Sequence, residues 1–143
     1  MPINQISVFI ENRPGRLHAI TKVLGDNNID IRALSLADTT NFGILRLIVN
    51  EPERADKVLR ENGFTVSTTE VLAVQVADEP GGLHSIMGKL YEHSIGVEYA
   101  YAFITRKADS AFVVLRVEDN EKAAQYLMSC GVKIVDADDI FEL

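Results

Sequence analysis

The sequence lacks tryptophan and long apolar runs, and it has a single cysteine, Cys130. One cysteine cannot form an internal disulfide, so the disulfide framework of a small secreted domain is excluded. No apolar run approaches the roughly 20 residues that a membrane span needs. The N-terminal residues 1–5 lack the basic and then apolar pattern of a secretory signal. We therefore expect a cytoplasmic protein with no membrane partner.

Positive charge is also scarce. The chain has 14 Lys and Arg residues against 21 Asp and Glu residues, for a net charge of −7. The basic residues are scattered, which argues against a surface that follows a phosphate backbone, so no nucleic-acid partner is expected. A small anion would have to be held by local amides and one or two close charges, because the overall field disfavours it.

Histidine, the commonest acid–base residue, occurs only three times, at His18, His84 and His93. No Ser or Cys nucleophile recurs with the repeated pair His18 and His84, and no group of residues has metal-ligand spacing. We therefore expect no catalytic residues, no metal and no cofactor, and hence a protein that is not an enzyme.

What the sequence does contain is an internal repeat. The stretch 12–18, NRPGRLH, returns as 78–84, DEPGGLH, 66 positions later. In both copies it joins an alternating apolar run to a helical pattern, which predicts a turn from a first strand into a first helix, with Pro14 and Pro80 at the first helical position. Glycines and free amides at a helix start favour a small anion such as a carboxylate, although a plain helix start explains the same pattern.

The two halves have the same order of predicted elements. The first half is expected to form strands at 6–10, 29–38, 45–49 and 64–70 and helices over 17–24 and 52–62. The second half is expected to form strands at 72–76, 95–106, 113–117 and 132–137 and helices over 83–90 and 120–130. Turns are expected at 39–41 and 107–109. This order predicts an α+β fold of two tandem ferredoxin-like βαββαβ domains, 1–70 and 71–143. Each would have an antiparallel four-stranded sheet with helices on one face.

The second strands carry more apolar residues than one buried face needs. The segment 33–37 is apolar on both sides, and Tyr99, Tyr101 and Phe103 share one side of the matching strand. Exposed apolar edges pair readily. We expect these strands to meet another sheet, across the repeats or in a homodimer; covering by the protein's own loops is the alternative.

A tandem βαββαβ chain with N-x-P-G and D-x-P-G in its first turns resembles the ACT domain family of amino-acid-sensing regulatory modules. The resemblance covers the whole chain and implies that a free amino acid binds between the first turn of one domain and the second strand of the next. The family's turn Asn matches Asn12, with Asp78 in the second copy, and its strand Asn matches Asp30, with Gly96. A His used by serine-regulated members is replaced by Ile10 and Val76, which argues against serine as the ligand.

The resemblance implies a division of roles. Backbone amides of the turns would receive the ligand carboxylate, Asn12, Asp30 and Asp78 its ammonium, and Arg16 would add a charge-assisted hydrogen bond. The full set of expected ligand-binding residues is Asn12, Arg13, Pro14, Gly15, Arg16, Leu17, Asp30, Asp78, Glu79, Pro80, Gly81, Gly82, Leu83 and Gly96.

Other proteins share this topology. An RNA-recognition module would need paired aromatics and a basic surface, whereas Phe9 and Phe112 are isolated. An acylphosphatase-like enzyme would need an Arg in its first turn, and Glu79 and Gly82 replace Arg13 and Arg16 in the second copy. The expected function is a non-catalytic sensor that binds a free amino acid and regulates a partner metabolic enzyme. The alternative is a ligand-independent dimerisation or docking module for such an enzyme.

Overall fold

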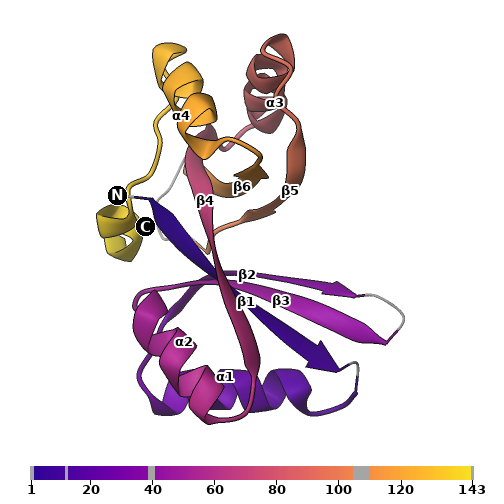
Figure 1. Ribbon diagram of the computed structural model, residues 1–143. Coiled ribbons are helices and arrows are strands. Elements are labelled where there is room, and N and C mark those ends of the chain that lie inside the picture. The colour runs from indigo at the N-terminus through magenta and orange to yellow at the C-terminus, as the bar shows by residue number, and fades with distance from the viewer. Residues whose placement is uncertain (1, 12, 39–40, 105–109, 143) are drawn as a thin grey trace. The chain divides into compact units, whose positions relative to one another are not determined.

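The structure is a computed structural model, and it describes the chain except for residues 1, 12, 39–40, 105–109 and 143. The chain divides into two compact units, one of Asn4–Thr69 and the other of Glu70–Leu143 together with Met1–Ile3. The division falls inside the strand β4 (Thr65–Ala77), which is therefore shared by both units (Figure 1).

The first unit is built from β1 (Ile3–Glu11), α1 (Arg16–Asp26), β2 (Ile31–Asp38), β3 (Phe42–Val49), α2 (Pro52–Glu61) and the first residues of β4. Its strands lie in the order β2-β3-β1-β4, with β3 antiparallel to both β1 and β2. Both helices lie on the same side of this sheet (Figure 1). The predicted βαββαβ order and four-stranded sheet of this half are confirmed.

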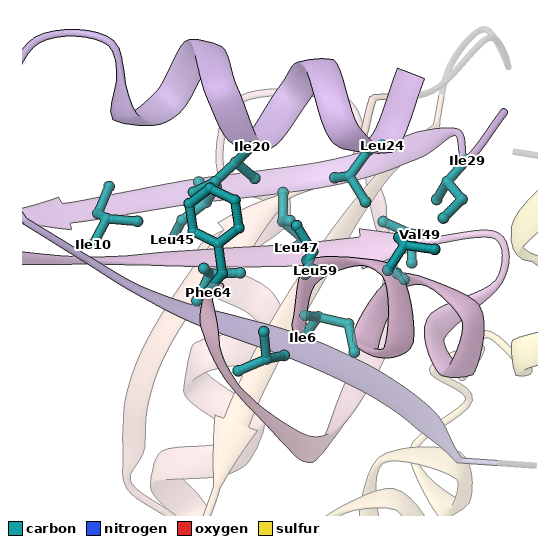
Figure 2. Close-up of a cluster of buried hydrophobic side chains, with 14 residues drawn as sticks. Ile6, Ile10, Ile20, Leu24, Ile29, Leu45, Leu47, Val49, Leu59 and Phe64 are labelled. Carbon is teal, nitrogen blue, oxygen red and sulfur yellow. The ribbon is translucent and has the colours of Figure 1, made fainter. Parts of the chain in front are cut away.

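The core of this unit lies between the sheet and its two helices, and Figure 2 shows its side chains pointing into that space. The alternating residues Ile6, Val8 and Ile10 of β1 are all buried, as the sequence predicts. Ile20 and Leu24 of α1 are fully buried as well, because the 3.6-residue period puts them on one face. Leu17, in the first turn of the same helix, is 39% exposed.

The second unit repeats the arrangement with α3 (Gly82–Glu92), β5 (Val97–Ala102), β6 (Ser110–Val117) and α4 (Asn120–Ser129). Its strands lie in the order β4-β6-β5, and both pairs are antiparallel. A core of side chains from α3, α4 and these strands fills the space beneath the helices. None of the helices in the described ranges has the length and apolar character to cross a membrane.

The α+β, tandem ferredoxin-like fold is confirmed, but the described residues form six strands rather than the eight expected. Strands expected at 64–70 and 72–76 are one continuous strand, β4, because no turn residue interrupts them. The expected strand at 132–137 is reduced to a single bridge between Ile134 and Val74, after which the chain forms a 3-10 helix, η1 (Ala137–Glu142). Of the expected turns at 39–41 and 107–109, residues 39–40 and 107–109 lie outside the described residues, and Asn41 forms a bend.

The turn that enters the first helix of each unit differs from the prediction. The helices begin at Arg16 and Gly82, so Pro14 and Pro80 lie two residues before the helix and not at its first position. Gly15 and Gly81 cap the helices with φ of 90° and 86°. In the second turn the Gly82 N–H donates to the Glu79 carbonyl at 3.0 Å. Proline followed by a left-handed glycine is the sequence that a type II turn requires, and this need outweighs the preference of Pro for a helix start.

Gly82 is required by close packing of α3 against the end of β4. A Cβ added at Gly82 would lie 2.1 Å from the carbonyl oxygen of Ala77, a backbone atom that cannot move without disturbing the strand. We expect Gly82→Ala to lower the free energy of unfolding by about 1–3 kcal/mol, as overpacking does.

The control is Gly88→Ala in the same helix, where an added Cβ meets nothing within 4 Å. We expect that change to be neutral or stabilising by up to about 1 kcal/mol, because Ala is the better helix former. Denaturant unfolding of both variants measures the difference, and equal stabilities would contradict the close approach at Gly82.

Candidate functional site

A cavity of about 190 Å³ lies at the start of α1, within the unit Asn4–Thr69. Its lining comes from the end of β1, the turn, the first helical residues and two neighbouring strands: Ile10, Glu11, Arg13, Arg16, Leu17, Leu36 and Gly43. Arg13, Arg16 and Leu17 belong to the predicted ligand-binding set, so the structure brings these three to one cavity.

The sheet register creates the space. Ile10 of β1 pairs with Gly43 of β3, and Leu36 of β2 pairs with Leu45, which belongs to the core beneath the helices. Directly paired residues of antiparallel strands share a face, so Leu36 lies on the helix-covered side of the edge strand. A Cβ at Gly43 would lie 3.3 Å from Cγ1 of Ile10, so the absence of a side chain there leaves room beside Ile10.

Arg16 supplies the positive charge of the cavity. Its guanidinium carbon lies 4.9 Å from the centroid of the Phe64 ring, a cation–π contact. Its Nε is buried and has no hydrogen-bond partner among the described residues. Because stacking occupies the face of the guanidinium, its in-plane N–H groups stay available for a carboxylate. A buried donor without a partner costs free energy, which an acceptor bound in the cavity would recover.

The other two charges of the lining balance each other. Nε of Arg13 lies 3.3 Å from Oε2 of Glu11, and both side chains are more than half exposed. Exposed pairs of this kind contribute little to stability, so either partner can turn to a ligand at low cost. The N–H groups of Leu17 and His18, in the first turn of α1, have no carbonyl within the helix to bond. With Arg16, they make this end of the cavity a place for an anionic group.

The second turn shows a different environment. Asp78, Glu79, Pro80 and Gly81 are exposed, while Gly82 is buried against β4. Of the amides of Gly81, Gly82 and Leu83, which were expected to receive a carboxylate, that of Gly82 is already bonded within the turn. Leu83 is 45% exposed. Arg16 has no counterpart here, because Gly82 occupies the matching position.

Asp30 lies away from the cavity of its own unit. It precedes β2, beyond the C-terminal end of α1, and a helix of 11 residues is about 16 Å long. The Asp30 N–H donates to Oδ1 of Asn50 at 3.0 Å, and its carboxylate lies 3.4 Å from Arg32. Asn12, the other predicted partner of an ammonium group, lies outside the described residues.

Gly96 lines a second cavity, of about 330 Å³, in the unit that contains α3 and α4. In the first unit, the side chain of Asn50 accepts a hydrogen bond from the backbone N–H of Asp30. In the second unit, Glu118 stands in place of Asn50, and Gly96 stands in place of Asp30. The rest of the lining includes His93, whose ring stacks on Tyr126 at 3.3 Å between centroids. A hydrogen bond with Cys130, assisted by desolvation and by Glu92, raises the pKa of Tyr126 to about 12, so the phenol is neutral at physiological pH.

Several cavity residues were not anticipated as site residues: Ile10, Glu11, Leu36, Gly43 and the stacking partner Phe64. One signal was present in the sequence, because a glycine inside an apolar strand such as β3 often marks a close approach or a ligand. The contact between Arg16 and Phe64 joins residues 48 positions apart, and no local pattern reveals it. His18 and His84 are exposed and do not line this cavity.

Known structures share this fold along nearly the whole chain. Protein BT0572 from Bacteroides thetaiotaomicron is 36% identical, with 100% of this chain and 98% of that chain covered and a TM-score of 0.92. The regulatory subunit of aspartate kinase from Thermus thermophilus is 13% identical, with 90% of this chain and 91% of that chain covered and a TM-score of 0.65. A structure of aspartokinase alpha and beta subunits is 15% identical at the same coverage, with a TM-score of 0.62.

No curated protein matches the sequence. The sequence profile of the ACT domain pair, in contrast, matches residues 1–143. The match spans both halves of the chain and both copies of the Pro-Gly turn, on which the resemblance to this family was based. The chain therefore belongs to the ACT domain family, as a pair of ACT domains.

Proposed function

We propose that this protein is a non-catalytic sensor that binds a free amino acid at its ACT domains and regulates a partner enzyme of amino-acid metabolism. The observation that carries the proposal is the buried Nε of Arg16, which has no hydrogen-bond partner within the described part of the chain and lies in a cavity beside the amides of a helix start. A guanidinium and oriented amides are the groups that recognise a carboxylate, which every free amino acid has.

The ammonium of the ligand needs an acceptor close to that carboxylate. Glu11 lines the same cavity and, in the described ranges, forms its ion pair with the exposed Arg13, so it can accept an ammonium within one unit. Asp30 and Asp78 remain proposed acceptors, as the ACT resemblance implies. Because Asp30 lies beyond the far end of α1, it would have to serve a turn outside its own unit.

The regulated partner is supported by analogy of fold. Two solved structures with this fold are described as a regulatory subunit of aspartate kinase and as aspartokinase alpha and beta subunits. A ligand that binds one packing arrangement of the ACT domains better than another shifts the population of those arrangements, and a docked enzyme responds to that shift. An amino acid has few atoms, so a dissociation constant from about micromolar to millimolar is expected.

The first test is the thermal unfolding midpoint of the whole chain with each of the twenty amino acids at about 5 mM. A ligand at 100 times its dissociation constant stabilises the folded state by roughly 2.7 kcal/mol, which should raise Tm by several degrees. We expect one amino acid, or a few of similar side chain, to do so. An unchanged Tm with all twenty would refute the sensor function.

The second test is Arg16→Gln, which removes the charge from the cavity. Loss of a charge-assisted hydrogen bond should weaken binding of the amino acid found in the first test by about 1.5–3 kcal/mol, or roughly 10-fold to 100-fold. Calorimetric titration measures this. The matched control is Arg54→Gln on α2, whose guanidinium pairs with the exposed Glu51 and does not line the cavity. Equal losses in both variants would remove Arg16 from the site.

A homodimer through β2 is also proposed. This strand lies at the end of the strand order, with β3 as its one neighbour among the described strands, and it carries Leu34 and Leu36 at 47% and 48% exposure. An apolar edge strand is a template for pairing with another sheet. The same feature favours the second candidate function, a dimerisation or docking module that binds no amino acid.

Leu34→Lys tests the dimer, because a charge on an edge strand opposes pairing. We expect sedimentation equilibrium to show the wild-type chain as a dimer and this variant as predominantly a monomer. Met128→Lys, at a 55% exposed position on α4, introduces the same charge elsewhere and should leave the dimer intact. A Leu34→Lys protein that stays dimeric would exclude β2 as the interface.

A further inference from the structure

We infer that the cavity at the start of α1 selects an amino acid with an aliphatic side chain of about valine to leucine size. This inference rests on the proposed function and adds the class of ligand. It depends on the distribution of polar and apolar groups in the lining, on the cavity volume and on the glycine at position 43.

The charged residues of the lining gather at the turn, whereas the lining residues from β2 and β3 carry no charge. The charged residues Glu11, Arg13 and Arg16 belong to the turn and its two ends. Among the described residues, β2 and β3 contribute Leu36 and Gly43, and β1 contributes the buried Ile10 beside Glu11. An amino acid whose carboxylate and ammonium meet the charged residues would therefore place its side chain toward the strands.

Among the described residues, the apolar part of the lining has no side chain that could hydrogen-bond a polar ligand. Ile10, Leu17 and Leu36 have no side-chain donor or acceptor, and Gly43 has no side chain at all. A hydroxyl, amide or charge placed there would lose water without gaining a hydrogen bond, which is unfavourable. A methyl-bearing side chain would instead cover Leu17 and Leu36, which are 39% and 48% exposed. Burying each additional methylene improves binding about fourfold.

The volume sets an upper size. A protein cavity of about 150 Å³ holds a benzene molecule, with its six carbon atoms. A cavity of about 190 Å³ thus fits the eight or nine heavy atoms of valine or leucine better than the larger aromatic amino acids.

Gly43 is the residue that determines specificity. An added Cβ would lie 3.3 Å from Cγ1 and 3.6 Å from Cδ1 of Ile10, so a side chain there would occupy the space that the ligand needs. The nearest atom belongs to the Ile10 side chain, which can shift, and the carbonyl oxygen of Ala37 lies at 3.4 Å, an ordinary van der Waals contact. The backbone φ of Gly43 is not positive, so the fold can accommodate a methyl group there.

The experiment is calorimetric titration of the whole chain with valine, leucine, alanine, serine, aspartate, lysine and tryptophan. We expect valine or leucine to bind at least tenfold more tightly than alanine, serine, aspartate or lysine, and tryptophan to bind weakly. Gly43→Ala should reduce the affinity for leucine more than that for alanine, and Gly43→Val should abolish binding of both. Gly25→Ala on α1, where an added Cβ meets nothing within 4 Å, is the matched control and should bind as the wild type does.

The outcomes separate the two proposals. If a charged or hydroxyl amino acid binds most tightly, the aliphatic class is refuted while the sensor function stands. If Gly43→Ala leaves the preference for leucine unchanged and its unliganded Tm matches that of the wild type, Gly43 is excluded as the specificity residue and the inference fails. If no amino acid binds, the proposed function itself fails.

Discussion

The turn from the first strand into the first helix is the constraint on which the rest of each unit depends. Proline followed by a glycine at φ near 90° reverses the chain within four residues, so the helix starts directly above the strand that precedes it. That placement lets Ile20 and Leu24 reach the core beside Leu45 and Leu47. It also leaves the first amides of the helix at the edge of a cavity. One local geometry therefore produces both the packing and the candidate site.

The two copies of the repeat share the geometry of this turn but differ in the side chains around it. Arg16 occupies the first helical position in one copy and stacks on Phe64, whereas Gly82 occupies it in the other and packs against a backbone carbonyl. The larger residue brings a charge into the cavity, and the smaller one brings the helix closer to the strand. The two turns are thus chemically unequal although their backbones are alike, and an anionic group would distinguish between them.

Much of the fold could be predicted from the sequence, because it follows from local periodicity. The alternation in β1, the helical spacing of Ile20 and Leu24 and the repeated Pro-Gly turn were sufficient for the βαββαβ order. The prediction of a strand at 132–137 was wrong, because the apolar character of a segment does not show how many residues of a neighbouring strand it can pair with. The turn was sufficient to predict Arg13, Arg16 and Leu17 as members of the candidate site, and all three line the cavity. Leu36 and Gly43 could not, since their proximity depends on strand register, which no short pattern encodes.

The boundary between the two units falls within a strand and not in a linker. Side chains along a strand alternate between the two faces of the sheet, so the position of a residue in β4 determines the face on which its side chain lies. Insertion or deletion of a single residue near Thr69 would reverse the faces of the side chains on one side of the change. Whereas most domain pairs tolerate variation in the length of their connection, homologues of this protein should vary there by substitution, or by changes of an even number of residues.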